Sequence, residues 1–197
     1  MKRVMRVRSR QVVHETARMY GSVAMREFVC AEIARKQWIY KIITGERESE
    51  AVIFQNESFM VLPDTEAPNE MGLLNWMVIF KDADLMSMRS LRGSHVCLLK
   101  EIIAKIRELL PAELDSPMVY FHYPPSVWQL HLHVAAPCDM LRTTNSMQKV
   151  CFVEDVVSNL EIDPDYYAKV TLSYVMPSTH ELSVLCANNV DRDADSI

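Results

Sequence analysis

Glycine is scarce in this sequence: only four of the 197 residues are glycine, and they lie far apart. Loops that bind dinucleotides or nucleoside triphosphates place several glycines close together, in the patterns GxGxxG and GxxxxGK(S/T), because the backbone must approach the phosphates. Neither pattern occurs in the chain. We therefore exclude a fold that holds phosphates in a glycine-rich loop.

Paired cysteines are also missing. No two cysteines have the CxxC spacing that is typical of zinc knuckles, and their odd number does not fit the disulfide framework of a small secreted domain. We interpret them as reduced thiols of an intracellular protein, which places the protein in the cytoplasm, the nucleus or both. The five residues are Cys30, Cys97, Cys138, Cys151 and Cys186.

Long apolar runs and an excess of positive charge are absent too. No apolar stretch reaches the ~18 residues of a membrane-spanning helix, and the basic first residues are not followed by the apolar segment of a secretory signal. The 21 Lys and Arg against 26 Asp and Glu give a formal net charge of −5. Such a protein is not suited to cover long nucleic acid through its net field, although a local site could bind a short nucleotide. We predict neither a membrane nor a long nucleic acid as partner.

The composition that remains is that of an ordinary globular domain, with 49% apolar and 24% charged residues. The clearest pattern is a run of apolar residues at every third or fourth position over 94–110, which predicts a helix. Short apolar stretches lie on both sides of it, so we predict an α+β domain with a largely antiparallel sheet. Helices are expected over 24–43, 94–110, 147–160 and 179–187, and strands over 51–55, 58–63, 72–80, 118–123, 127–135 and 168–176.

The segment 128–134, with the sequence WQLHLHV, carries the most chemistry. Alternate side chains of a strand share a face, so His131 and His133 are expected side by side. On the preceding strand, His122 alternates in the same way and could approach them. The expected inward set is Trp128, Leu130, Leu132 and Val134, and the expected outward set is Gln129, His131, His133 and Ala135.

Three interpretations of the histidine pair compete on the residues alone. The first is structural, with exposed or hydrogen-bonded histidines on a sheet face. The second is zinc, although no third ligand is obvious in the sequence nearby. The third is nucleotidyl chemistry, because a neutral imidazole is a good nucleophile at phosphorus and a neighbouring imidazolium can stabilise phosphate charge.

Three segments resemble the scavenger mRNA decapping enzymes of the histidine-triad superfamily. Residues 120–137 (YFHYPPSVWQLHLHVAAP) resemble that family's Y-x-H-Y-x-P-S stretch and the His-x-His-x-His strand that follows it. Residues 37–42 (QWIYKI) and 159–164 (NLEIDP), the latter followed by Tyr167, resemble two further family segments in the same order and spacing. The resemblance covers roughly residues 12–186.

The resemblance implies a histidine-triad fold, in which helices pack on a twisted antiparallel sheet and two chains pair as a homodimer. It also implies that most of the family's N-terminal domain is missing here, with a remnant around His14, Glu15, Thr16 and Tyr20. We therefore divide the chain into a basic arm with this remnant (1–23), the histidine-triad domain (24–187) and a disordered tail (188–197). No cofactor and no metal are implied.

The catalytic residues that the resemblance implies lie in and before the histidine strand. His131 falls on the family's nucleophile and His133 on the third histidine of the triad. Gln129 stands where the family has the first histidine, and an amide can form hydrogen bonds but cannot titrate. His122 and Ser126 fall on positions that contact phosphate.

The cap-binding residues are implied in the same way. Trp38 falls on the tryptophan that stacks on methylated guanine, Glu48 on the carboxylate that reads the guanine edge, and Pro63 and Asp64 on a pair beside the cap. Two positions depart from the family. Glu66 replaces a lysine that contacts phosphate, and Lys149 takes the place of a phosphate-binding arginine if the alignment includes a one-residue gap.

The activity implied by the resemblance is hydrolysis of a methylated cap dinucleotide or a short capped RNA, through a nucleotidyl-histidine intermediate. Gln129 and Glu66 favour an alternative, a cap- or nucleotide-binding module with little catalysis. A further alternative keeps the triad chemistry but acts on dinucleoside polyphosphates.

Overall fold

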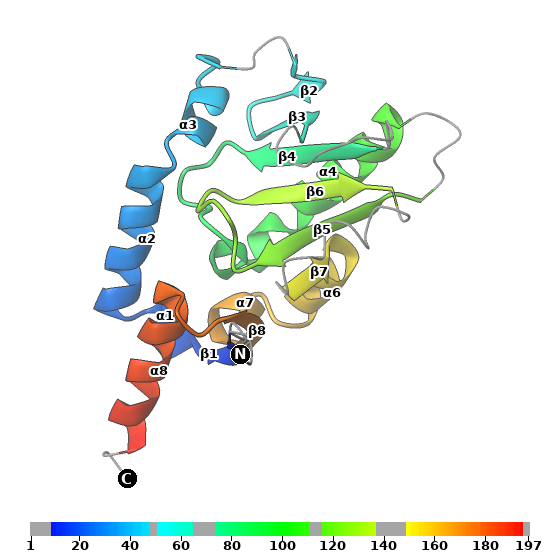
Figure 1. The fold of residues 1–197 in the computed structure, drawn as a ribbon. Helices are drawn as coiled ribbons and strands as arrows, with labels where there is room; N and C mark the ends of the chain where they lie inside the picture. The colour runs from blue at the N-terminus through cyan, green and yellow to red at the C-terminus, as the bar shows by residue number, and fades with distance from the viewer. Residues whose placement is uncertain (1–8, 48–50, 65–73, 111–115, 137–148, 195–197) are drawn as a thin grey trace, which may run out of the picture.

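Antiparallel strands dominate the part of the chain that the computed structural model describes, which comprises residues 9–47, 51–64, 74–110, 116–136 and 149–194. The strands form one six-stranded sheet and one two-stranded sheet, and each strand pair is antiparallel. Helix α4 (Val96–Leu109) lies behind the larger sheet, and α2 (Val23–Arg35) and α3 (Trp38–Ile43) lie along one side of it (Figure 1). The predicted α+β class with a largely antiparallel sheet is therefore confirmed.

The larger sheet has the strand order β2-β3-β4-β6-β5-β7. Strand β5 has the predicted bounds, whereas β6 begins at His131 rather than at residue 127, because residues 127–130 form a bent connection before it. The predicted inward set is nevertheless fully buried, from Trp128 to Val134. The strands are β2 Phe54–Gln55, β3 Phe59–Pro63, β4 Asn75–Phe80, β5 Met118–Tyr123, β6 His131–Ala135 and β7 Lys149–Phe152.

One face of this sheet forms the main hydrophobic core. Side chains such as Phe80, Phe121 and Leu132 alternate onto this face and are completely or almost completely buried. Helix α4 (Val96–Leu109) covers it and lies behind the sheet in Figure 1. Its buried residues recur at helical spacing, which confirms the helix predicted over 94–110: Leu99, Ile102 and Ile106.

The opposite face carries the histidines. The strand register aligns Met77 with His133 and Ile79 with His131, and directly opposed residues of antiparallel strands share a face. Helix α3 (Trp38–Ile43) packs against Met77, Ile79 and their apolar neighbours. We call this surface the histidine face, and it brings α3 into the same region as the triad strand.

The helix predicted over 24–43 is two helices, α2 (Val23–Arg35) and α3. Lys36 leaves the helical conformation between them, with φ −114° and ψ 52°. Its ammonium group contacts Glu32 and donates a hydrogen bond to the Ser126 carbonyl at 2.5 Å. The break therefore places the start of α3 near the loop that precedes β6.

The smaller sheet pairs the two ends of the chain. Strand β1 (Arg10–Glu15) lies antiparallel to β8 (Leu172–Pro177), so Arg10 and Gln11, predicted as part of the basic arm, belong to a paired strand. The strand predicted over 168–176 starts later, because α7 (Tyr166–Lys169) occupies its first residues. In Figure 1 this sheet lies below the larger one.

Two further predictions at the C-terminal end were wrong in their bounds. The helix predicted over 147–160 is strand β7 followed by α6 (Val153–Ile162), since residues 149–152 pair with β5 instead of continuing the helix. Helix α8 runs from Glu181 to Ala194, past residue 187 and into the segment predicted as a disordered tail. The remaining short helices are α1 Ala17–Tyr20, η2 Met88–Ser90 and η3 Gly93–His95.

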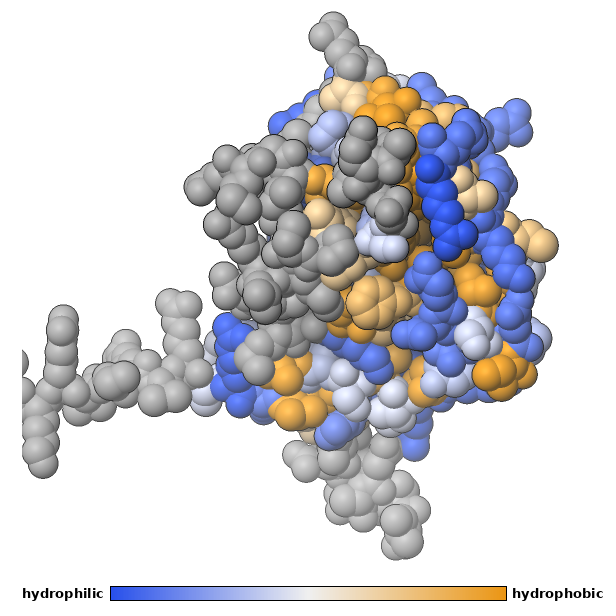
Figure 2. Space-filling model, turned by 90° about the vertical axis from the view of Figure 1, so that its right-hand side faces the viewer, coloured by the Kyte–Doolittle hydropathy of each residue, from blue (hydrophilic) through white to orange (hydrophobic). Residues whose placement is uncertain are grey.

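The surface of the described residues is mixed. No helix in these ranges has both the length and the apolar composition that would let it cross a membrane. Figure 2 shows apolar and polar residues interspersed on the face that it presents. Exposed large apolar side chains are scattered over several elements, for example Val12, Val23 and Ile162.

Candidate active site with three converging histidines

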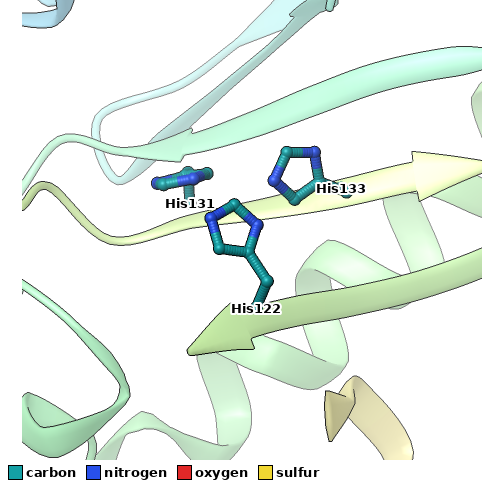
Figure 3. A group of neighbouring side chains, drawn as sticks. All are labelled: His122, His131 and His133. Atoms are coloured by element: carbon teal, nitrogen blue, oxygen red, sulfur yellow. The ribbon is translucent and has the colours of Figure 1, made fainter. Parts of the chain in front are cut away.

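Three imidazole rings meet on the histidine face of strands β5 and β6 (Figure 3). His122 comes from β5, and His131 and His133 come from β6. The ring centroids of His122 and His133 are 4.7 Å apart, and each of them lies 5.2 Å from that of His131. The strand register explains why the rings meet. Tyr120 pairs with His133 and shares its face, and His122, two residues after Tyr120, lies on the same face because side chains alternate along a strand.

His131 has its hydrogen and its lone pair in fixed positions. Its Nδ1 atom lies 2.7 Å from the backbone carbonyl of Gln129, and a carbonyl only accepts, so Nδ1 carries the hydrogen. The lone pair is then on Nε2. Burial, followed by the neighbouring His133, lowers the pKa of His131 to about 4, so that the ring is neutral near pH 7. This is the form that a nucleophilic imidazole needs.

His133 is oriented by a carboxylate. Its Nδ1 atom lies 3.3 Å from Oδ2 of Asp64, the residue that follows β3. Because a carboxylate accepts, Nδ1 again carries the hydrogen in the neutral ring. The Nε2 atom is buried, and within the described part of the chain it has no hydrogen-bond partner.

His122 has the opposite arrangement. Its Nε2 atom accepts a hydrogen bond from the backbone N–H of Ser126 at 3.1 Å. Pro124 and Pro125 have no N–H, so Ser126 supplies the first backbone donor after Tyr123. The hydrogen of the neutral ring is therefore on Nδ1. Burial first, and then the two neighbouring histidines, lower the pKa of His122 well below its usual value.

The cluster bears directly on the zinc interpretation. Each of the three histidines offers a nitrogen within 4.8 Å of the other two, so His122, which was expected to approach the pair, supplies a third imidazole. As hydrogen-bonded, however, the set presents two lone pairs and one N–H. A three-histidine metal site would require His122 to give up its bond from Ser126. The arrangement fits better a ligand that is attacked by one ring and accepts a hydrogen bond from another.

Gln129 contributes differently from what the sequence indicated. It precedes β6, its side chain is completely buried, and its Nε2 donates to the carbonyls of Phe80 and Asp82 at 2.7 and 2.9 Å. It reaches His131 through its backbone carbonyl. The side chain therefore fixes the entry into β6, and the backbone fixes the nucleophile ring.

Of the predicted cap-binding residues, Trp38 lies on the expected face. It is the first residue of α3 and is half-buried against the apolar cluster of the histidine face. Pro63 ends β3 opposite Trp76, and alternation places it on the core face. Asp64, one residue further, lies on the histidine face and contacts His133. Glu48 and Glu66 are outside the described residues.

Lys149 is not brought to the histidines. It pairs with Tyr123 at the start of β7, whereas the neighbouring Val150 pairs with His122. Lys149 therefore shares the core face with Tyr123, and it lines a cavity of about 180 Å³ together with residues of α6 and α7. The phosphate-binding role predicted for Lys149 does not agree with this register.

A buried polar network behind the site had no signal in the sequence. Glu15 on β1 is completely buried and accepts hydrogen bonds from Arg89, Tyr123 and Tyr174. Tyr123 directly follows His122, so the network anchors the loop that carries Ser126. A glutamate in a short strand and an arginine 74 positions away do not reveal such a pairing without the fold.

Comparison with known proteins decides the family. The family model described as "Scavenger mRNA decapping enzyme C-term binding" matches residues 37–148, which is more than half of the chain. The chain belongs to this family. The predicted family is thereby confirmed, and the matched region contains Trp38, Asp64 and all three histidines of the cluster.

Relatives of the family align with most of the chain at low sequence identity. The chain is 26% identical over 183 residues to the m7GpppX diphosphatase of Bos taurus, which aligns 88% of this chain with 54% of that protein. The chain is 25% identical over 182 residues to the Schizosaccharomyces pombe protein of the same name, an alignment that covers 88% of this chain and 60% of that protein. The chain thus spans about half the length of the curated relatives it matches.

Solved structures with a similar arrangement include Hnt3 in complex with DNA and guanosine. It is 14% identical, has a TM-score of 0.44, and covers 80% of this chain and 96% of its own. The aprataxin ortholog Hnt3 from Schizosaccharomyces pombe has the same identity and TM-score.

Proposed function

We propose that this protein is a scavenger-type decapping hydrolase, which cleaves m7GpppN dinucleotide or short capped RNA into m7GMP and a nucleoside or oligonucleotide diphosphate. The observation that supports this most directly is the arrangement of His131. Its Nδ1–H is fixed by a backbone carbonyl, which leaves the lone pair on Nε2, and its ring centroid lies 5.2 Å from those of two further imidazoles. The relatives named m7GpppX diphosphatase carry out the corresponding reaction, as their name states.

The reaction proceeds in two steps in this proposal. Nε2 of His131 forms a bond to the phosphorus nearest the methylguanosine, the bond from that phosphorus to the bridging oxygen breaks, and the diphosphate leaves with the electron pair. Water then attacks the nucleotidyl-histidine, the P–N bond breaks, and the electron pair returns to His131. The N–H on Nδ1 of His122 is suited to donate to a phosphate oxygen in both steps.

Recognition of the base falls to the other end of the histidine face. The half-buried indole of Trp38 offers a face for the methylated guanine ring, which carries a positive charge. Glu48 is proposed to accept from the guanine edge, as the family resemblance implies. Two chains are proposed to pair as a homodimer, and the protein is proposed to act in the cytoplasm, the nucleus or both.

A binding module with little catalysis is the alternative that one observation favours. Gln129 cannot titrate, and both of its amide hydrogens bind backbone carbonyls, so this position of the triad supplies no proton. The three converging histidines nevertheless retain a nucleophile, a donor and an acceptor, which is why we prefer the hydrolase.

Product analysis separates these functions. The protein is incubated with m7GpppG and, in a parallel reaction, with a diadenosine polyphosphate, and the nucleotides are separated by chromatography. Release of m7GMP and GDP supports the decapping hydrolase, and the His131→Ala variant is the control. Cleavage of only the diadenosine compound would instead support a dinucleoside polyphosphate hydrolase, and binding without cleavage would support the binding module.

A further inference from the structure

We infer that Asp64 acts as a positioning residue for His133: its carboxylate fixes the hydrogen of that ring on Nδ1, so that Nε2 presents a lone pair to the triad. Family resemblance implies only a place beside the cap for Asp64. The expected effect of Asp64 on the reaction rate rests on the proposed decapping function. The contact by which Asp64 orients the His133 ring does not.

The backbone around Asp64 is held firmly enough for this task. Its N–H donates to the Asn75 carbonyl at 3.0 Å, and the Asn75 side chain donates back to the Asp64 carbonyl at 3.2 Å. Alternation along β3 places Leu62 and Asp64 on the histidine face, and Leu62 pairs with Met77, the neighbour of His133. Asp64 therefore approaches His133 across β4 from a fixed position at the strand end.

The contact between Asp64 and His133 is largely shielded from water. The Asp64 side chain is only 8% exposed and that of His133 17% exposed, so neither charge nor N–H is well solvated. A buried carboxylate is costly unless it is hydrogen-bonded or paired, and the Nδ1–H of His133 faces it at 3.3 Å. Turning the ring over, or moving the hydrogen to Nε2, would leave the carboxylate facing a C–H or a lone pair.

The other constraints on His133 do not choose between its nitrogens. Its ring stacks against Tyr120, with centroids 5.4 Å apart and planes at 21°, and against His122, at 4.7 Å and 30°. Stacking fixes the plane of a ring but not which nitrogen carries the hydrogen. The contact with Asp64 determines which nitrogen carries the hydrogen, in the way that carboxylates orient histidines at metal sites and in catalytic triads.

The consequence for the reaction is a proton acceptor at a defined atom. The Nε2 atom of His133 can take a proton from the water that attacks the nucleotidyl-histidine, and the hydroxide then bonds to phosphorus as the P–N bond breaks. Without Asp64, part of the His133 population would carry its hydrogen on Nε2 and could not accept this proton.

Kinetics with two substrates distinguish positioning from cap contact. We expect Asp64→Ala to lower kcat by roughly 10- to 100-fold on both m7GpppG and unmethylated GpppG, below the ~10²–10⁴-fold that proton transfer contributes in full. In the His133→Ala background, Asp64→Ala should have no further effect on kcat. A higher KM for m7GpppG alone, with kcat unchanged, would show that Asp64 only contacts the cap and would overturn the inference.

A measurement without substrate tests the same relation independently. In ¹⁵N NMR of the free protein at neutral pH, we expect His133 to show hydrogen on Nδ1, and Asp64→Ala to shift part of the signal to hydrogen on Nε2. Asp64→Asn, whose side-chain oxygen can still accept, should retain more of the original form. An unchanged His133 spectrum in Asp64→Ala would refute the positioning role, even if the enzyme is active.

A failure of the proposed function and a failure of the inference about Asp64 can therefore be told apart. If the wild-type protein cleaves neither substrate, the proposed function fails and the NMR result still decides the role of Asp64. Asp84→Ala is the matched control, because Asp84 is exposed and lies outside the histidine face. Its spectrum and kinetics should equal those of the wild type.

Discussion

Arg89 and Glu15 form a buried ion pair, with Nε of the arginine 3.0 Å from Oε1 of the glutamate and both side chains at most 1% exposed. The same carboxylate accepts from the hydroxyls of Tyr123 at 2.6 Å and Tyr174 at 3.0 Å. Burial, together with the nearby Glu15, raises the pKa of both tyrosines, so they remain donors. Through the hydrogen bond from Tyr123, Glu15 thus joins β1 to the end of β5, where the loop that contains Ser126 begins.

The Glu15→Gln variant should be markedly less stable than the wild type. It leaves Arg89 buried without a counter-charge, and breaking a buried pair in this way costs about 3–5 kcal/mol of unfolding free energy. Urea denaturation measures the loss. The exposed Asp163, which pairs with Lys169, provides the control, and Asp163→Asn should leave the denaturation midpoint nearly unchanged. Equal midpoints for Glu15→Gln and the wild type would contradict this account.

Sequence patterns predicted the elements whose signals are local. The alternation within β6 and the helical spacing of 94–110 depend on residues that are neighbours in sequence, and both features are present in the structure. The part of the predicted strand before His131 is a bent connection instead. The break between α2 and α3 contains neither glycine nor proline. It coincides with the contact of Lys36 with Ser126, 90 positions away, which no local pattern contains.

The differences between the predicted and the observed site have a similar origin. Assigning Lys149 to a phosphate-binding position required a one-residue gap, and in a strand a shift of one residue moves a side chain to the other face. The pairing of Val150, rather than Lys149, with His122 shows the result. The contact of Asp64 with His133 was also not predicted, because it depends on the order of β3, β4 and β6 in the sheet.

Replacing His131 should abolish turnover while leaving cap binding largely intact. The His131→Ala variant lacks the nucleophile, whereas Trp38 and the other proposed recognition residues remain. His133→Ala should be milder, because His133 assists but forms no covalent bond. Single-turnover assays and binding titrations measure both effects, with His14→Ala, an exposed histidine on β1, as the control. Equal and small losses in the two variants would argue against a nucleotidyl-histidine.

The unfolding free energy should fall as the pH decreases from 6.5 to about 4. Burial lowers the pKa of His131 to about 4, below its value of about 6.5 in an unfolded chain, so in this range the unfolded state binds a proton that the folded state does not. At about 1.4 kcal/mol for each pKa unit, His131 accounts for a loss on the order of 3 kcal/mol. His122, whose pKa is also lowered by burial, adds to it.

Denaturation at pH 7 and pH 4.5 tests this dependence. Since carboxylates also titrate towards the lower pH, the informative quantity is the difference between proteins. His131→Gln should lose less stability than the wild type over this pH range, and His14→Gln should lose as much as the wild type. Identical pH dependence in all three proteins would show that His131 is protonated as readily in the folded state as in the unfolded state.

The protein should be a homodimer in solution, with twice the 22.7 kDa mass of one chain. We base this prediction on the family resemblance. The apolar run of 94–110 and Phe80 could have indicated a dimer interface, but the core-facing side chains of α4 and that of Phe80 are buried within the single chain. Light scattering at micromolar concentration measures the mass directly. A monomer under these conditions would contradict the prediction.

Preference for the methylated cap should depend on Trp38 rather than on the histidines. Methylation gives guanine a delocalised positive charge, and an indole face attracts a stacked cation by about 0.5–2 kcal/mol, which corresponds to roughly 2- to 30-fold in affinity. In the inactive His131→Ala background, Trp38→Leu should therefore weaken binding of m7GpppG more than that of GpppG. Trp76→Leu, on the core face, is the matched control and should preserve the ratio of the affinity for m7GpppG to that for GpppG.

Glu48→Gln should lower this affinity ratio as Trp38→Leu does, because a carboxylate accepts more strongly from the charged ring. If the protein binds both dinucleotides equally tightly, Trp38 is a packing residue, and the triad acts on a different substrate.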